Sequence, residues 1–138
     1  MAESAQGALR LVLADDDEIV REVYRYALPA DGFEVRLASD GAEAFQLYLE
    51  WQPQMMVLDI QMPEMSGYAL LKRIREHEKG WDKPTAIVMA TAMSDKSDIM
   101  DCLQLGIQGY VVKPIRPEEI ASRLASYYQA FIEKREGR

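Results

Sequence analysis

Segments with the pattern of a β-strand alternate with segments with the pattern of an α-helix about five times along the 138 residues. Short apolar runs that suit strands lie at residues 9–14, 33–38, 54–58, 85–90 and 109–112. Stretches with an apolar face at helical spacing lie between or after them, at residues 18–28, 42–51, 68–76, 99–105 and 120–132. Because alternating β and α units form a parallel sheet with helices on both faces, this order predicts an α/β fold.

The strand-like runs differ in how much of their surface they can bury. The third and fourth runs are apolar nearly throughout, which is typical of strands buried on both faces of a parallel sheet. The second run places Glu34 and Arg36 between Phe33, Val35 and Leu37. This alternation predicts a strand with one exposed face.

Polar side chains stand where four of the five predicted strands end. They are Asp15, Asp16, Asp59, Thr91 and Lys113. Ligands of open α/β sheets bind beyond the carboxyl ends of the strands, so we expect these side chains to meet at one edge of the sheet.

The residue types at this edge favour metal-assisted phosphoryl transfer. Clustered carboxylates raise one another's pKa unless a cation relieves them, and Mg²⁺ prefers oxygen ligands. A carboxylate such as Asp59 can attack a phosphoryl donor, while a metal and the Lys113 ammonium neutralise charge on the transferring oxygens. Asp17 is better interpreted as the N-cap of the first helix than as a metal ligand.

Four segments that carry these residues resemble one protein family. Residues 11–17, 57–67, 89–92 and 109–114 resemble the receiver domains of two-component response regulators, and the likeness extends from about residue 9 to about residue 132. The resemblance implies a flavodoxin-like, doubly wound sheet of five parallel strands in the order 2-1-3-4-5, with helices on both faces. It also implies that the domain is a switch that catalyses only its own phosphorylation and dephosphorylation.

The resemblance implies a role for each residue of the site. Asp59 would be the phosphoacceptor and a metal ligand. Asp16 would bind Mg²⁺ directly, with Asp15 beside the metal, and Gln61 would contribute its backbone carbonyl. Thr91 would donate a hydrogen bond to the phosphoryl group and Lys113 would pair with it. A cis peptide bond between Lys113 and Pro114 is also implied.

Tyr110 and Met93 carry two finer expectations. Receivers often have an aromatic residue at the position of Tyr110 that turns inward when the hydroxyl residue moves, although a half-buried strand tyrosine is the alternative. Gln61 and Met93 would flank the phosphoryl group. Because an apolar Met93 cannot orient an attacking water, we expect slow self-hydrolysis.

Domain limits and partners follow from the same pattern. We expect a flexible N-terminal segment at 1–8, a receiver domain at 9–133 and a short tail at 134–138. The expected partners are a histidine kinase or phosphotransfer protein and a downstream effector, or a second copy of the chain in a homodimer, bound through the surface around residues 95–123. Gly67 is expected to permit a tight turn or close packing before the third helix.

Composition limits the other classes of partner. The formal net charge of -7 argues against direct nucleic-acid binding, and the sequence contains neither a secretion signal nor a run of apolar residues that could span a membrane. Cys102 is the only cysteine, so no intramolecular disulfide can form, and we expect a cytoplasmic domain.

Two other functions remain as alternatives. A phosphatase with an aspartyl nucleophile commonly needs a second acid two residues further on, where this chain has Gln61. A flavodoxin-like cofactor binder would need a phosphate-binding loop after the first strand, where Asp15 and its acidic neighbours would repel a phosphate.

Overall fold

Five parallel strands form one sheet in the order β2-β1-β3-β4-β5. The structure is a computed structural model that describes residues 7–92 and 96–137, so most of the predicted N-terminal segment, residues 1–6, lies outside the described residues. The strands are β1 (Leu9–Ala14), β2 (Phe33–Ala38), β3 (Met55–Asp59), β4 (Ala86–Thr91) and β5 (Gly109–Val112). Each strand runs parallel to its neighbours, which confirms the predicted flavodoxin-like fold and strand order.

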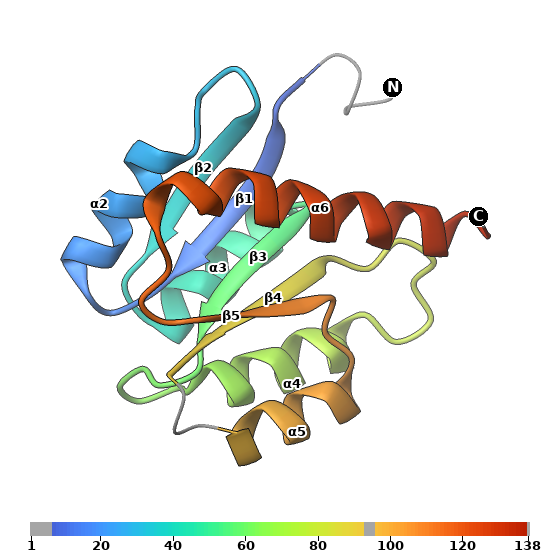
Figure 1. Cartoon of the computed structure of the whole chain (residues 1–138). Coiled ribbons are helices and arrows are strands. Elements are labelled where there is room, and N and C mark those ends of the chain that lie inside the picture. The colour runs from blue at the N-terminus through green and yellow to red at the C-terminus, as the bar shows by residue number, and fades with distance from the viewer. Residues whose placement is uncertain (1–6, 93–95, 138) are drawn as a thin grey trace.

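Helices cover both faces of this sheet, as predicted (Figure 1). Helices α2 (Glu18–Ala27) and α6 (Pro117–Arg135) pack on one face. Helices α3 (Gly41–Trp51), α4 (Gly67–His77) and α5 (Lys96–Leu105) pack on the other. Helix α6 continues to Arg135, beyond the stretch predicted at residues 120–132, because Lys134 and Arg135 suit the negative end of the helix dipole.

Successive strand residues supply two hydrophobic clusters. Leu11 and Leu13 of β1 pack beneath α2 and α6, whereas Val12 and Ala14 pack beneath the other three helices. Strands β3 and β4 are buried along their whole length, and β2 alternates because it lies at the edge of the sheet. These burial patterns confirm the predictions made from the apolar runs.

Side-chain caps begin the helices that follow the functional strands. Asp17 accepts a hydrogen bond from the amide of Ile19 at 2.8 Å and caps α2, as predicted. Ser66 caps α4 by accepting a hydrogen bond from the amide of Ala69 at 3.1 Å. Both caps hold a helix start close to the carboxyl end of a strand. No helix in the two described ranges is both long and apolar enough to cross a membrane.

Candidate functional site

The strand order reverses between β1 and β3, and the acidic residues lie there. The chain leaves β1 toward β2 on one side and returns to β3 on the other side. Asp15 directly follows β1 and Asp59 is the last residue of β3. In doubly wound sheets this reversal opens a crevice at the carboxyl ends of the strands, where ligands bind.

Three carboxylates meet in the crevice. One oxygen from each of Asp15, Asp16 and Asp59 lies within 4.8 Å of the others. Asp15 is 1% exposed and Asp59 is 6% exposed, whereas Asp16 is exposed to solvent. The set supplies hard oxygen ligands from the protein and leaves one side open to water, which is the arrangement that Mg²⁺ prefers.

Lys113 is the cation that contacts this cluster. Its Nζ lies 3.1 Å from Asp15 Oδ2 and 3.2 Å from Asp59 Oδ1. Asp15 Oδ2 is buried and accepts no hydrogen bond from the described residues, so the ammonium meets it as an ion pair. Three carboxylates and one ammonium leave two negative charges, which a divalent cation would balance. The residues present therefore fit a magnesium site.

The electrostatics of the cluster perturb both partners. Burial and then the charge of Asp15 raise the pKa of Asp59 to about 6, although Lys113 and the amide of Gln61 lower it. Burial lowers the pKa of Lys113, but the charges of Asp15 and Asp59 outweigh burial and the pKa is raised. Lys113 therefore stays protonated at neutral pH. Any added cation would stabilise the ionised form of Asp59.

The two oxygens of Asp59 have different surroundings. Oδ1 accepts a hydrogen bond from the amide of Gln61 at 3.3 Å and contacts Lys113. No hydrogen bond or ion pair to Oδ2 is present within the part of the chain that the structure describes. This second oxygen is therefore the one available to a ligand in the crevice.

Backbone contacts hold the acidic loop in place. Asp15 Oδ1 accepts a hydrogen bond from the amide of Asp17 at 2.9 Å, and the Arg21 guanidinium donates one to the Asp15 carbonyl at 2.8 Å. The sequence pattern alone did not single out Arg21 for this contact. Its position one turn after the acidic residues was the signal available.

Gly67 allows the start of α4 to lie against the end of β3. Its amide donates a hydrogen bond to the Ile60 carbonyl at 2.8 Å. A Cβ at this position would lie 2.9 Å from Ile60 Cα and would also collide with the backbone of Asp59. The predicted close-packing role of Gly67 is confirmed, and it serves the segment that carries Asp59.

Thr91 and Tyr110 line one cavity beside the acidic cluster. Thr91 ends β4, is buried, and donates a hydrogen bond from its hydroxyl to the Ala92 carbonyl at 2.9 Å. Tyr110 is 44% exposed. The cavity, of about 460 Å³, is bounded by these residues and by side chains of α5 that are apolar apart from Lys96. Met93 lies outside the described residues, and the Lys113–Pro114 bond is cis, as the resemblance implied.

The fold and the acidic crevice together define a flavodoxin-like domain with a carboxylate cluster at its strand reversal. The sequence profile of the response regulator receiver domain matches residues 11–125, and the chain belongs to this family. It is thus a receiver domain of a two-component system. This family membership replaces the phosphatase and cofactor-binding alternatives.

Individual relatives agree with this assignment. The chain is 36% identical over 115 residues to "Probable transcriptional regulator ycf27" of Guillardia theta, covering 83% of this chain and 43% of that protein. It is 36% identical over 114 residues to the transcriptional regulatory protein GltR of Pseudomonas aeruginosa, covering 83% of this chain and 46% of that protein. The chain spans less than half the length of these two relatives.

A solved structure shows the same architecture. The chemotaxis protein CheY4 of Vibrio cholerae superposes with a TM-score of 0.78 at 26% identity, covering 88% of this chain and 99% of that one.

Proposed function

We propose that this domain accepts a phosphoryl group on Asp59, with Mg²⁺ bound by Asp16, Asp59 and the backbone carbonyl of Gln61, and with Asp15 beside the metal. The observation that carries the proposal is the position of Lys113, which contacts Asp15 and Asp59 at 3.1 and 3.2 Å. A lysine in this place can pair with a phosphoryl oxygen as soon as Asp59 is phosphorylated. The ion pairs with two buried carboxylates distinguish Lys113 from a solvated surface lysine.

The transfer itself needs one nucleophile and neutralised charge. Oδ2 of Asp59 attacks the phosphorus of the donor, and the bond from phosphorus to the donor's leaving atom breaks. For a phosphohistidine donor the leaving atom is an imidazole nitrogen, which keeps the electron pair of the broken bond. A bound Mg²⁺ would supply positive charge for the phosphoryl oxygens. Lys113 would supply the remaining ammonium charge to the same group.

The response would pass through Thr91 and Tyr110. In the present structure the Thr91 hydroxyl is engaged by the Ala92 carbonyl, and Tyr110 is partly exposed beside the cavity that both residues line. A phosphoryl group on Asp59 offers new acceptor oxygens, so Thr91 would turn toward it and leave space for the Tyr110 ring. This exchange would change the surface formed by α5, β5 and α6.

The partners of the domain follow from this cycle. A histidine kinase or phosphotransfer protein would supply the phosphoryl group in the cytoplasm. The surface of α5, β5 and α6 would then bind a downstream effector or a second copy of the chain. Direct contact with nucleic acid is not expected from a chain with a net charge of -7. The domain would act on no separate substrate and would catalyse only its own phosphorylation and dephosphorylation.

Intact mass after incubation with acetyl phosphate tests the proposal. We expect one phosphoryl adduct that needs Mg²⁺ and is absent from Asp59→Asn. The exposed variant Asp82→Asn should still form it, because Asp82 lies outside the crevice. A folded, Mg²⁺-binding protein that accepts no phosphoryl group from acetyl phosphate or from a phosphorylated histidine phosphotransfer protein would contradict the proposal.

The lifetime of the phosphoryl group is a separate prediction. We expect Met93→Glu to speed dephosphorylation about tenfold or more, because a carboxylate at this position can orient and activate an attacking water. The decay of the phosphorylated mass with time measures the rate, and Leu49→Glu, on the exposed surface of α3, is the matched control. Equal decay in Met93→Glu and the unmodified chain would show that Met93 does not shield the phosphate.

A further inference from the structure

A second cavity lies at the amino edge of the sheet, at the opposite end of the strands from the acidic crevice. Its walls come from the start of β1, the segments that lead into β3 and β4, and the end of α6. Its volume is about 210 Å³. Neither the phosphorylation chemistry nor the partner surface around residues 95–123 makes use of this cavity.

Three cationic side chains from distant parts of the sequence face this cavity. They are Arg10, Lys83 and Arg135, and the cavity lining includes no Asp or Glu. This composition is unexpected in a chain with 23 acidic residues and a net charge of -7. Anion-binding sites have a local excess of positive charge. Here three cationic side chains line the cavity and no acidic side chain in its lining offsets them.

The three cations are not neutralised by ion pairs within the described residues. The Arg10 guanidinium donates to the Gln52 carbonyl at 2.8 Å, and the Arg135 guanidinium lies 5.5 Å from the centre of the Phe131 ring. Lys83 is exposed. A carbonyl and a ring orient the guanidinium groups but leave their positive charge available to a ligand.

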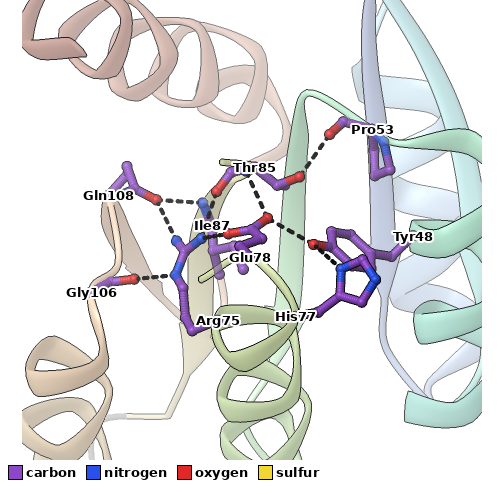
Figure 2. A network of polar contacts seen from close by, with 9 residues as sticks. All are labelled: Tyr48, Pro53, Arg75, His77, Glu78, Thr85, Ile87, Gly106 and Gln108. Carbon is purple, nitrogen blue, oxygen red and sulfur yellow. Dashed lines mark hydrogen bonds and ion pairs between the residues drawn. The ribbon is translucent and has the colours of Figure 1, made fainter. Parts of the chain in front are cut away.

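The floor of the cavity is fixed by buried hydrogen bonds. Glu78 Oε2 accepts hydrogen bonds from the Tyr48 hydroxyl and the Thr85 amide, each at 2.9 Å, and both contacts are drawn in Figure 2. The Thr85 hydroxyl donates to the Pro53 carbonyl at 3.0 Å. Tyr48, Pro53 and Thr85 all line the cavity, so its base is already formed without a ligand.

The charge of Glu78 does not cancel the positive potential above this floor. Arg75 Nη1 lies 2.6 Å from Glu78 Oε1 and pairs with it on the side away from Tyr48 (Figure 2). Because this pair is internally balanced, the cavity is left with the charge of the three cations at its wall. Neutral hydrogen-bonding groups are also present, since Gln54 and Tyr128 line the cavity and are joined at 3.2 Å.

The size of the cavity limits the ligand. Pockets for drug-sized molecules have volumes of roughly 300–1,000 Å³, and this cavity of about 210 Å³ is smaller. It suits a compact group with several charges rather than a nucleotide or a flat cofactor. We propose that this pocket binds a compact polyanion that carries phosphate or carboxylate groups, held by Arg10, Lys83 and Arg135.

A two-dimensional NMR titration of the full chain tests the site directly. Pyrophosphate and citrate are added in separate titrations, without Mg²⁺ and at constant ionic strength set with NaCl. We expect saturable shifts of the Trp81 indole and of the amides of Gln54, Lys83 and Thr85 with at least one of the two anions. Pyrophosphate represents the phosphate source of the ligand and citrate the carboxylate source, so the tighter binder identifies the class.

Charge variants separate a built site from general attraction. Lys83→Gln with Arg135→Gln should weaken binding about tenfold or more, because two charge-assisted hydrogen bonds are lost. Lys72→Gln with Arg25→Gln removes the same charge from exposed positions outside the pocket and should change the affinity by less than about twofold. Lys83→Arg should retain binding.

Three results would overturn the proposal. The first is the absence of saturable shifts with either anion. The second is a set of shifts confined to the crevice around Asp16, Gln61 and Thr91. The third is an equal loss of affinity in the pocket variant and in the exposed control, which would show that only net charge matters.

Discussion

The carboxyl of Asp59 is held where its charged form is disfavoured. Burial and the neighbouring Asp15 raise its pKa from 3.8 to about 6. A raised pKa means that the folded state binds the proton more tightly than the unfolded state does. The resulting stabilisation is present below about pH 4 and is lost as the pH rises through about 6.

Asp59→Asn should therefore stabilise the protein at neutral pH. We expect the free energy of unfolding at pH 7, without Mg²⁺, to rise by about 1 to 2 kcal/mol. The reason is that the variant removes a negative charge that burial and Asp15 disfavour. The gain should shrink as the pH falls from about 6 to about 4, where unmodified Asp59 becomes protonated in the fold. Urea unfolding at several pH values measures this, with exposed Asp82→Asn as control. A gain that stays constant over this pH range would refute the assigned pKa.

Helix α4 contributes a buried ion pair that joins three other elements. Arg75 donates to the Gly106 carbonyl at 3.0 Å after α5, to the Thr85 carbonyl at 3.0 Å before β4, and to the Gln108 side chain at 3.1 Å before β5. Its partner Glu78 is only 5% exposed. One guanidinium thus ties the amino ends of β4 and β5 to α4 (Figure 2).

Arg75→Met should destabilise the protein by about 3 to 5 kcal/mol, because it leaves the Glu78 carboxylate buried without its counter-charge. The exposed pair Arg25–Glu22, at 3.5 Å with 65% and 61% exposed side chains, provides the matched comparison. Arg25→Met should cost less than about 1 kcal/mol. Chemical denaturation of both variants measures the difference, and similar losses in the two would mean that burial of the Arg75–Glu78 pair has no energetic consequence.

The whole molecule has two chemically different ends joined by one sheet. The carboxyl edge carries the acidic crevice, and the amino edge carries the cationic cavity and the Arg75–Glu78 network. Helices α2 and α6 on one face and α3, α4 and α5 on the other enclose the sheet between them (Figure 1). Thr91, β5 and α5 border one cavity, so in the proposed cycle a signal that starts at Asp59 would reach the protein surface most directly through them.

Beryllofluoride with Mg²⁺, which mimics the phosphoryl group, should therefore change amide hydrogen exchange in α5 and β5 severalfold. Amides of α3 should keep their exchange rates, because that helix packs against β1, β2 and α4 and contributes nothing to the cavity. Exchange measured by mass spectrometry, with Asp59→Asn as the unresponsive control, tests this path. Changes restricted to the loops that carry Asp15 and Asp59 would argue against transmission to the surface of α5, β5 and α6.

Local pattern was enough to predict the elements and the edge where the chemistry gathers. Strand and helix periodicity, with Asp17 as a cap and apolar runs for β3 and β4, depends on residues close together in the chain. Parallel α/β topology then brings the strand ends to one edge, so the acids and Lys113 could be expected to meet there. The strand order came from the family resemblance rather than from periodicity.

Only the tertiary structure decided which polar residues are buried and how they are paired. Glu78, near the end of an exposed-looking helical stretch, becomes buried because Tyr48 from α3 and Thr85 before β4 cover it beside its helical neighbour Arg75. Nothing in the local sequence distinguishes Arg10, Lys83 and Arg135 from other surface cations. They line one cavity only because the fold brings together β1, the segment before β4 and the end of α6. The Tyr48–Glu78 contact and the cavity wall join residues tens of positions apart, so their energies depend on three-dimensional distance and local dielectric, which no short window of sequence contains.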